Sequence, residues 1–554
     1  MDPAPAPPAW RSSLPPCVRH EDDDVLVVSK PHGWNTHAPA PHAGEGLYDW
    51  LRDREPRWAA LAILHRLDRD TSGLIVFGKG ERANRSLAAQ FESRSVRKGY
   101  RLRTDAPPRP RHKEARLQPL EGGGWRVTSW LHKVGDRQAS QPSGPPGAEA
   151  ITDFVPGSNG IHGEWLARPR TGRTHQIRIH AAALGMPIRG DTLYGGSNAP
   201  RLFLHAESLA FAHPATGVAM EFHEPPAFDD VPEGSAALAR AMFHETETNA
   251  HRCWHGAAHG HPGWTADRLG DCLLAASGEG APDADLRQAW PRTWDPPKAI
   301  YVKAWRRDVQ RTQPGDASPA LVEGTAAPAR FEISENGVRF ALSMEEGYSA
   351  GLFLDQRDNR RRILAGHVGH AFPWPEAGLK GRDALNAFAY TGGFSVCAAL
   401  AGARVTSLDL SRKYLDWCRD NLRRNGIDPG GHDFIYGDCF DWMSRLARKG
   451  RRFDLVVVDP PTFSRSREQG DFRAEKDYGR LAELAARLAA PGCVLFFSTN
   501  AARLAPAEFL GMVRSGVAQA GKTLRAEHYA PQPPDFPVTR DQPAYLKTVW
   551  LRLG

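Results

Sequence analysis

The stretch RVTSLDLSRKYLDWCRDNLRRNG at residues 404–426 decides the fold class of the C-terminal half. Its first seven residues form an apolar run typical of a buried strand. Apolar residues then recur at helical spacing up to Gly426, which is well placed to end a helix. A very apolar run, FDLVVVDPP, follows at 453–461. This alternation of strands and amphipathic helices predicts a doubly wound parallel sheet.

Residues that carry chemistry stand at the ends of these predicted strands. The run NAFAYTGGFSVCAALAG at 386–402 follows an apolar strand and opens a helix, with a glycine pair at the turn. Taken alone, that pair is compatible with a nucleotide-binding turn or with a purely structural one. Asp409 ends the next strand, Asp438 lies in GDCFDW, and Asp459 begins DPPTF. These four stations, in this order, resemble a class I S-adenosylmethionine-dependent methyltransferase.

Two further motifs narrow the resemblance. GLFLDQRDNRR at 351–361 and PAYLKTVWLRL at 543–553 resemble the RlmI/RlmK-type methyltransferases of large-subunit ribosomal RNA. Residues 251–271 and IYVKAWRRDV at 300–309 resemble the small α+β auxiliary domain that precedes the catalytic sheet in the RlmI type. The resemblance implies S-adenosylmethionine as cofactor and Asp459 as a catalytic residue. It also implies a cofactor-binding set of Asp355, Arg357, Asn386, Tyr390, Gly392, Asp409, Asp438, Asp459 and Pro460.

The methylated atom depends on whether a thiol stands beside the base. Methylation at C5 of a pyrimidine requires a thiolate to add at C6, whereas N7 of guanine is already nucleophilic. The DPPTF turn and FFSTN at 496–500 offer Thr462, Ser498 and Thr499, and no cysteine. This pattern looks more like the RlmK type, and we expect guanine N7 to be methylated. Cytosine C5, with Cys439 as a displaced nucleophile, is the alternative.

A second constellation lies in the N-terminal half. In HRLDRDTSGLIVFGK at 65–79, Asp68 stands between two arginines, just before a turn and an apolar strand. An isolated HRLD tetrapeptide is also compatible with a carboxylate that caps a turn or pairs with Arg66. Together with RKGY at 97–100, residues 168–195 and RLFLHAESLAFAHP at 201–214, however, it resembles the RluA-type pseudouridine synthases over residues 17–226.

This second resemblance assigns roles to individual residues. It implies that Asp68 is the catalytic aspartate, that Tyr100 stacks on the target base and helps to move the C5 proton, and that Arg178 pairs with Asp68. Arg66 would help to extrude the nucleotide, and the RNA-binding residues would be Arg66, Arg173 and His175. Such a synthase needs no cofactor.

Two groups of histidines invite a metal-binding interpretation. His175, Gln176 and His180 lie beside Arg178, but the resemblance implies that they shape the core and the loop. Cys253, His255, His259 and His261 lie close in sequence, but their spacing matches no common zinc site. We therefore expect no metal.

Composition bounds the remaining possibilities. With 554 residues the chain is too long for one domain, and 41% hydrophobic residues exclude a mostly disordered or collagen-like chain. The net charge is +7, and residues 51–200 carry 25 Lys and Arg against 14 Asp and Glu, a surplus that favours a polyanionic partner. Seven cysteines without a C-x-x-C pair, and the lack of any run near 18 apolar residues, predict a cytoplasmic protein outside the membrane.

The predicted architecture is multidomain, with α+β and α/β parts. It consists of a disordered tail (1–16), a mixed-sheet pseudouridine synthase fold (17–228), a linker (229–245), a small α+β auxiliary, RNA-binding domain (246–325) and a Rossmann-like doubly wound methyltransferase domain (326–554). The predicted function is that of a bifunctional enzyme that modifies RNA, most simply large-subunit rRNA. Two alternatives are that only one half is catalytic and the other docks RNA, and that the chain is a non-catalytic ribosome-assembly factor.

Overall fold

A computed structural model describes residues 13–39, 42–43, 46–110, 113–135, 137–157, 163–229, 234–278, 294–304, 318–346, 349–466 and 470–554, and the predicted tail falls mostly outside these ranges. The described chain divides into two compact units. Unit 2 comprises Leu14–His37 and Ala60–Met242, and unit 1 comprises Ala38–Ala59 and Phe243–Gly554. The division after residue 242 lies inside the predicted linker. No helix in the described ranges is long and apolar enough to cross a membrane.

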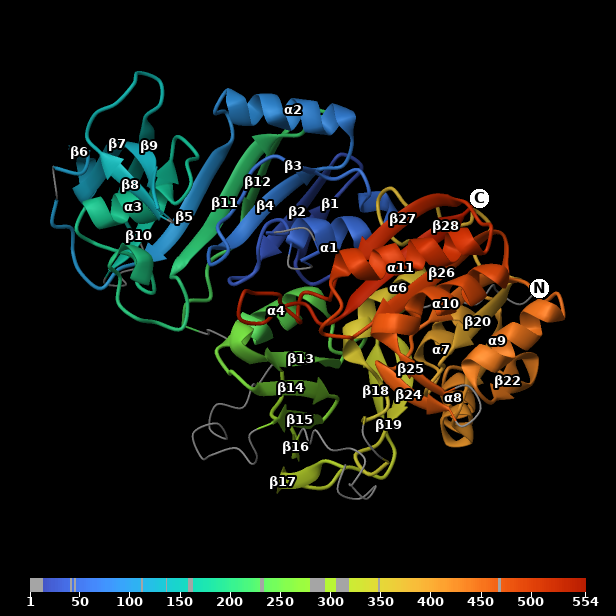
Figure 1. Ribbon diagram of the computed structural model, residues 1–554. Helices are drawn as coiled ribbons and strands as arrows, with labels where there is room; N and C mark the ends of the chain where they lie inside the picture. Colours follow the sequence, from blue (N-terminus) through green and yellow to red (C-terminus); the bar gives the residue numbers. More distant parts are fainter. Residues whose placement is uncertain are drawn as a thin grey trace, which may run out of the picture. The chain divides into compact units, whose positions relative to one another are not determined.

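Unit 2 is built on one mixed sheet, ordered β1-β2-β4-β11-β5-β10-β9-β7-β6, with β12 beside β11, β3 beside β4 and β8 beside β7 (Figure 1). The strands are β1 (Val18–Glu21), β2 (Val25–Lys30), β3 (Ala62–Ile63), β4 (Ser72–Gly78), β5 (Arg97–Arg103), β6 (Arg116–Leu120), β7 (Gly124–Val134), β8 (Arg137–Gln141), β9 (Ala150–Pro156), β10 (Glu164–Pro169), β11 (Leu204–Ala212) and β12 (Ala219–His223). Three α-helices accompany them within the described residues, namely α2 (Glu81–Glu92), α3 (Gln176–Ala183) and α4 (Gly234–Met242).

The apolar strand predicted after Asp68 forms as β4, which pairs with β2. β2 and β4 are buried at every position, which explains why both read as continuous apolar runs. They pair antiparallel, with Val27 opposite Val76 and Val28 opposite Ile75. β11 lies between β4 and β5 and pairs parallel with β4, so the chain that follows Asp68 enters the middle of the sheet.

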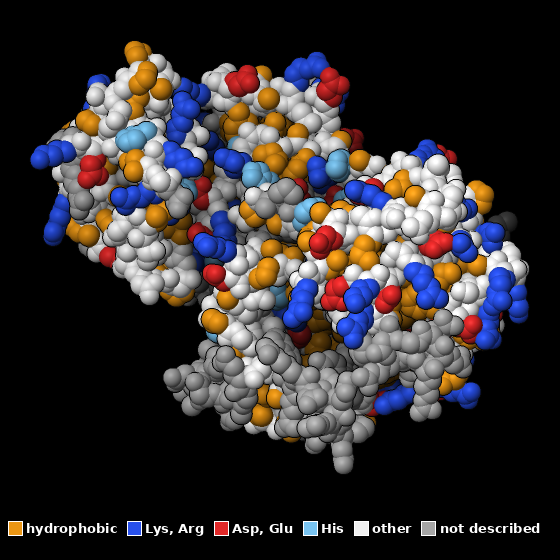
Figure 2. Space-filling view, in the orientation of Figure 1, with side chains coloured by type: hydrophobic (Ala, Val, Ile, Leu, Met, Phe, Trp, Pro, Cys, Tyr) orange, Lys and Arg blue, Asp and Glu red, His pale blue; other side chains and the backbone are white. Residues whose placement is uncertain are grey.

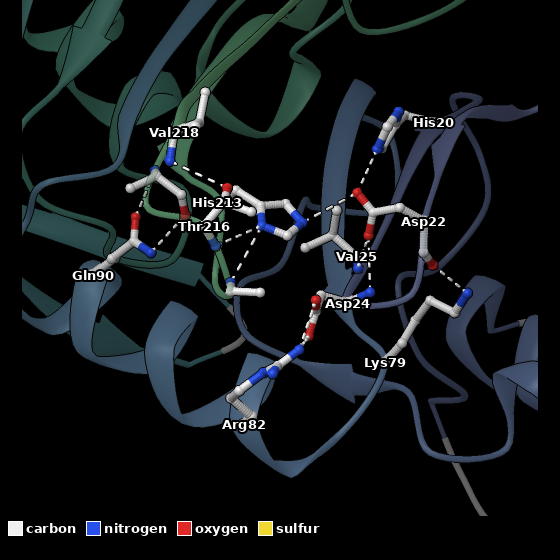
Figure 3. Close-up of polar contacts among 12 residues, drawn as sticks. His20, Asp22, Asp24, Val25, Lys79, Arg82, Gln90, His213, Thr216 and Val218 are labelled. Atoms are coloured by element: carbon white, nitrogen blue, oxygen red, sulfur yellow. Dashed lines mark hydrogen bonds and ion pairs between the residues drawn. The ribbon is translucent and has the colours of Figure 1, made fainter.

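A polar cluster fixes the edge of this sheet where β1 turns into β2 (Figure 3). One oxygen of the Asp22 carboxylate lies 2.8 Å from Nε2 of His20 and 3.3 Å from Nε2 of His213, in the turn after β11. The other oxygen accepts from the backbone N–H groups of Asp24 and Val25. Burial opposes ionisation of Asp22, but these hydrogen bonds outweigh it and lower the pKa of Asp22 to about 2.

Part of the predicted linker is helical. Residues 234–242 form α4, with Ala236 and Met242 on its buried face. The Ala241 carbonyl accepts a hydrogen bond of 3.0 Å from the Cys17 N–H. The acidic, proline-containing residues before the helix obscured its short apolar pattern, so the linker prediction was too long.

Unit 1 contains a seven-stranded sheet in the order β22-β21-β20-β23-β26-β28-β27, with β28 antiparallel to both of its neighbours (Figure 1). These strands are β20 (Asp383–Ala387), β21 (Arg404–Asp409), β22 (Asp433–Tyr436), β23 (Phe453–Val458), β26 (Ala489–Thr499), β27 (Leu524–Ala530) and β28 (Lys547–Leu553). The helices are α6 (Arg357–Ala365), α7 (Gly393–Leu400), α8 (Arg412–Arg424), α9 (Cys439–Arg448), α10 (Ala474–Arg487) and α11 (Pro506–Gln519). This is the predicted Rossmann-like doubly wound arrangement.

Three smaller sheets complete this unit. A five-stranded sheet runs in the order β13 (Ala250–His255), β14 (Trp264–Leu269), β15 (Cys272–Ser277), β16 (Ala299–Ala304) and β17 (Ala320–Gly324). The other two sheets are hairpins. One consists of β18 (Phe331–Glu335) and β19 (Val338–Leu342), which precede β20 in the sequence, and the other of β24 (Phe463–Ser466) and β25 (Gly470–Arg473), which come between β23 and β26. One core cluster includes Leu269 and Cys272 together with Phe496, so the small sheet and the main sheet share a core.

Gly426 and Gly392 adopt a backbone conformation that residues with a side chain rarely adopt. Both have positive φ, +72° after α8 and +83° before α7. A Cβ on Gly392 would collide with the sulfur of Cys418 in α8. The predicted helix stop and the predicted glycine turn are therefore both backbone requirements.

The segment 38–59 belongs to unit 1, which differs from the predicted 17–228 domain. Its helix α1 (Leu47–Arg54) precedes Glu55, which forms an ion pair with Arg361 of α6. Asp53 lies 3.3 Å from Nε2 of His528 and 4.0 Å from the Arg362 guanidinium. These charges are distant in sequence, so no local pattern could reveal the arrangement.

We predict that Glu335→Ala lowers the free energy of unfolding of unit 1 by about 3–5 kcal/mol, because it leaves the Arg360 guanidinium buried without its carboxylate. Arg360 donates to both Glu335 oxygens at 2.6 and 2.7 Å, and both residues are almost inaccessible. Denaturant unfolding measures the effect. The control is Glu332→Ala in the same strand, whose partner Arg424 is exposed, at a cost below about 1 kcal/mol. Equal losses for the two variants would contradict the prediction.

Candidate functional site

Unit 2 has a cavity of about 530 Å³, lined by the loop before β4, by β5 and by residues around the start of α3. Every residue predicted for the synthase lines it, namely Arg66, Asp68, Tyr100, Arg173, His175 and Arg178. Three separate stretches of sequence supply them. Lys and Arg side chains also occupy much of the visible surface of this unit (Figure 2), in keeping with the positive surplus of residues 51–200.

The loop that carries Asp68 is held by the segment that precedes residue 38. The Thr36 hydroxyl donates to the Leu67 carbonyl at 2.8 Å and accepts from the Leu67 N–H at 3.1 Å. The Arg69 carbonyl accepts from the Gly33 N–H and from the buried Lys30 ammonium, both at 2.9 Å. Residues on both sides of Asp68 are thus fixed, and its carboxylate remains partly accessible from the cavity.

Arg178 lies beside Asp68 but makes its hydrogen bonds to another carboxylate. Its Nη1 is 3.7 Å from the Asp68 carboxylate. Its Nε and Nη2 donate to the two oxygens of Asp191 at 2.8 and 2.7 Å. Asp191 is buried. The predicted pairing with Asp68 is therefore a longer charge contact, and Asp191 is the residue that orients the guanidinium.

His175 and Tyr194 complete this group. His175 has φ of +56°, a strained value for a residue with a Cβ, and its Nε2 is 4.0 Å from Asp68. Its Nδ1 is 2.8 Å from the Tyr194 hydroxyl, which also accepts from the Gln138 N–H. The Arg178 guanidinium lies over the Tyr194 ring at 5.1 Å. Asp191 and Tyr194 both fall in GDTLYG, yet nothing in that motif alone signals their partners.

Other residues near this cavity have structural surroundings. His180 is buried between the Ser129 and Thr152 hydroxyls, and burial lowers the pKa of His180 to about 3. The Gln176 amide is fully engaged, with its nitrogen donating to Ile151 and Thr152. Tyr100 is buried on β5, and burial, together with the charge of Asp68, raises the pKa of its hydroxyl.

In unit 1, parallel pairing brings the predicted acidic residues to one edge of the sheet. β20 lies between β21 and β23, with Ala387 opposite both Leu408 and Val458. Asp409 and Asp459 come next along their strands, on the same side. The Asp409 oxygens accept from the N–H groups of Tyr390 and Ser411, both at 2.8 Å. Burial raises the pKa of Asp409.

Asp459 forms the centre of a buried polar group. Its Oδ1 is hydrogen-bonded to the Ser498 hydroxyl, and the Gln356 amide donates to Asp459 at 3.3 Å and to Ser498 at 2.8 Å. Burial raises the pKa of Asp459 to about 6, and the charge of Asp355 adds to the effect. Gln356 and Ser498 are partners that sequence reasoning missed, because they come from segments far apart in the chain.

The remaining predicted residues have varied surroundings. Asn386 donates to Ser395, Pro460 is buried, and Asp438 caps α9 by accepting from the Asp441 N–H at 3.0 Å. Tyr390 lies in the turn after β20 with φ of +50°. Asp355 accepts from the Tyr545 hydroxyl at 2.7 Å.

Arg357 stands apart from the other predicted cofactor contacts. Its side chain is fully buried, and its terminal nitrogens donate to both oxygens of Asp535 at 2.8 and 2.6 Å. The predicted contact with a cofactor is therefore not supported by its surroundings. Its position favours a structural role, which the FLDQR motif alone could not separate from ligand binding.

The cysteines and histidines provide no obvious reactive or metal-binding group. All seven cysteines are buried, and none of them forms a disulfide bond. Burial raises the pKa of both Cys439 and Cys493, which disfavours their thiolates. Within the described ranges, no three or more His, Cys, Asp or Glu side chains are arranged to hold a metal ion.

We predict that Asp191→Asn lowers the rate of the reaction in the unit 2 cavity by about 100-fold, because a loosened Arg178 guanidinium no longer faces Asp68 correctly. The variant keeps the shape of the side chain. The control is Asp105→Asn, which removes an exposed carboxylate 4.0 Å from Arg189. Single-turnover kinetics separate this effect from RNA binding. An unchanged rate for Asp191→Asn would show that the orientation of Arg178 is not set by residue 191.

Comparisons with known proteins agree with this geometry. Residues 249–552 match the family described as S-adenosylmethionine-dependent methyltransferase, and residues 24–183 match RNA pseudouridylate synthase. The chain is 32% identical over 330 residues to a ribosomal RNA large subunit methyltransferase of Deinococcus radiodurans, covering 57% of this chain and 77% of that protein.

Two further relatives carry more specific names. Ribosomal RNA large subunit methyltransferase I of Aeromonas salmonicida is 31% identical, over 53% of this chain and 72% of its own length. Ribosomal RNA large subunit methyltransferase K of Neisseria meningitidis serogroup B is 38% identical, over 31% of this chain and 45% of its own length. With the site geometry described above, the chain thus belongs to the S-adenosylmethionine-dependent methyltransferase family and carries an RNA pseudouridylate synthase domain in its N-terminal part.

Proposed function

We propose that this protein is a cytoplasmic bifunctional enzyme that modifies large-subunit rRNA. Unit 2 converts a uridine to pseudouridine, and unit 1 methylates a guanine at N7. The observation that carries the proposal is that six residues from three distant stretches of sequence line the unit 2 cavity. The names of the relatives, which refer to large-subunit rRNA, support the choice of substrate.

In unit 2, we assign the chemistry to Asp68. Isomerisation breaks the bond between N1 and C1′, turns the uracil and forms a bond between C5 and C1′, while C5 loses its proton and N1 gains one. A positioned carboxylate can act on the sugar without any cofactor. The Arg178 guanidinium lies 3.7 Å from that carboxylate and places a positive charge beside it. The exposed Arg66 and Arg173 would contact the RNA backbone and the displaced nucleotide.

Tyr100 would serve as the platform for the turning base. It is buried except where it lines the cavity, so its ring is available for stacking. Because its pKa is raised, the hydroxyl stays protonated at neutral pH. It can then give or relay a proton but does not supply a standing negative charge.

In unit 1, the residues at the edge of the sheet fit an adenosine-containing methyl donor. S-adenosylmethionine supplies an electrophilic methyl group on a sulfonium. Asp409 is placed at the end of β21 to accept from ribose hydroxyls, and Asp438 follows the next strand, where the adenine would lie. Tyr390 and Gly392 lie in the turn after β20, which would bring the backbone close to the donor, and Asn386 lies in β20 just before that turn.

The surroundings of Asp459 favour a nitrogen as methyl acceptor. Carbon methylation would need a thiolate near Thr462 or Thr499, but the thiols of Cys439 and Cys493 are buried and have raised pKa values. Methylation at N7 gives the guanine ring a positive charge. With a pKa of about 6, Asp459 is ionised at neutral pH and would stabilise that charge as it develops.

We predict that Asp68→Asn reduces pseudouridine formation to background while methyl transfer stays within about twofold of the wild type, because the amide keeps the shape but is a poor nucleophile. Asp70→Asn changes an exposed carboxylate in the same loop and serves as the matched control. Mapping of pseudouridine in the product RNA measures the effect. Normal pseudouridine formation by Asp68→Asn would exclude this assignment.

We also predict that the protein forms no covalent adduct with RNA that contains 5-fluorocytosine, because no thiolate is available to add to C6. Nucleoside mass spectrometry should find 7-methylguanosine in the product. Detection of 5-methylcytidine, or of a trapped protein–RNA adduct, would instead show that carbon is methylated and that a displaced nucleophile such as Cys439 takes part.

A further inference from the structure

A cavity in unit 1 has no role in the functions proposed above. It measures about 210 Å³ and lies between the small sheet and the segment 349–355 that leads into α6. Residues of β13, β14, β15 and β16 line one side of it. We call it the small-sheet cavity. Its charged lining consists of Arg252, Asp267, Lys303 and Asp355, and its aromatic lining of Phe353 and Phe536.

The small-sheet cavity adjoins the group around Asp459. Asp355 lines the cavity, and the next residue, Gln356, donates to the Asp459 carboxylate and to the Ser498 hydroxyl. The charge of Asp355 also reaches Asp459, since it helps to raise the pKa of that residue. A molecule bound in this cavity would therefore lie beside Asp355, whose neighbour Gln356 is hydrogen-bonded to the Asp459 carboxylate.

The polar groups are arranged in two complementary sets. One oxygen of Asp355 accepts a hydrogen bond from the Tyr545 hydroxyl. Both oxygens of Asp267 accept from the Arg252 guanidinium, and each of them can accept a second hydrogen bond. Burial lowers the pKa of Lys303 to about 8, so its ammonium is still mostly charged at neutral pH. The lining thus offers carboxylate acceptors together with cationic donors.

This combination fits the Watson–Crick edge of guanine. That edge has two adjacent donors, N1–H and the N2 amino group, which suit a carboxylate, followed by the O6 acceptor, which suits an ammonium or a guanidinium. Cytosine and adenine each offer one donor group there, and uracil offers one donor between two acceptors. Guanine is the base that satisfies both sets of groups.

The aromatic residues suit a flat ligand. The Phe353 side chain is 48% exposed, although it lies beside a cavity and could have packed inward. Its ring lies 5.5 Å from that of Tyr390, in the turn after β20. Phe536 packs under the Arg252 guanidinium at 4.5 Å. An exposed ring at the mouth of a polar cavity is a stacking platform for an extruded base.

We infer that the small-sheet cavity receives the target guanine, extruded from the RNA, and holds its Watson–Crick edge against Asp355, Asp267 and Lys303. This inference rests on the proposed methylation of guanine and deepens it. The bound edge includes N2, which is thereby shielded, whereas N7 lies on the opposite ring and faces the mouth. It also makes Asp355 a contact of the base and not of the methyl donor.

The first test uses full-length Asp355→Asn. The amide oxygen can still accept from Tyr545, but the second carboxylate oxygen is replaced by a donor that opposes N1–H. We expect kcat/KM for large-subunit rRNA to fall by about 10–100-fold, with the dissociation constant for S-adenosylmethionine within twofold of the wild type. Asp271→Asn, at an exposed carboxylate in the turn between β14 and β15, is the matched control. Weakened donor binding with an unchanged KM for RNA would overturn the inference.

The second test separates this inference from the proposed reaction, because it measures binding without methyl transfer. Saturation-transfer NMR on the full chain compares guanosine, inosine and 7-deazaguanosine as probes. We expect inosine, which lacks the N2 amino group, to bind about tenfold more weakly than guanosine, and 7-deazaguanosine to bind equally well. Equal binding of inosine, or no binding of guanosine, would overturn the inference. If this binding pattern holds but the RNA product contains neither 7-methylguanosine nor a guanosine methylated at N2, the proposed reaction fails and guanine binding in the cavity stands; methylation at N2 would overturn the inference.

Discussion

Buried arginine–carboxylate pairs hold the segments that carry the functional residues in both units. Arg178 is fixed by Asp191 below the Asp68 loop, Arg360 by Glu335, and Arg357 by Asp535. A buried guanidinium is costly unless its donors are satisfied, so each pair permits essentially one arrangement of the chain around it. In α6, two such pairs fix the helix that follows Gln356, and Gln356 in turn binds Asp459. The positions of the proposed site residues thus depend on buried ion pairs that take no part in the proposed reactions.

The parallel sheet of unit 1 adds a second constraint. Because β20, β21 and β23 are parallel neighbours, residues that follow them must lie along one edge, whatever the intervening helices do. In unit 2, other interactions bring the predicted site residues together. There the Asp68 loop, β5 and α3 contribute to one cavity, and long-range hydrogen bonds such as that between Thr36 and Leu67 supply the precision.

The sequence was sufficient for features that depend on local patterns. The apolar patterns identified β4, β21 and β23, and glycine identified the end of α8 because Gly426 requires positive φ. The family resemblance predicted the site residues of unit 2, and the residues that it named line one cavity. Features that depend on distant partners could not be predicted. Nothing near Arg178 indicates that Asp191 takes its hydrogen bonds, and nothing in FLDQR separates Gln356, which touches Asp459, from Arg357, which is bound to Asp535.

We propose that one chain performs two modifications of the same class of RNA. The most direct test of this proposal is to map pseudouridine and methylated nucleosides in rRNA from cells with and without this protein. In cells without the protein, we expect one or more pseudouridines and one or more 7-methylguanosines of the large subunit to disappear together. Both modifications should return when the intact chain is restored. Loss of neither mark would contradict the account, and loss of only one would show that a single unit is catalytic.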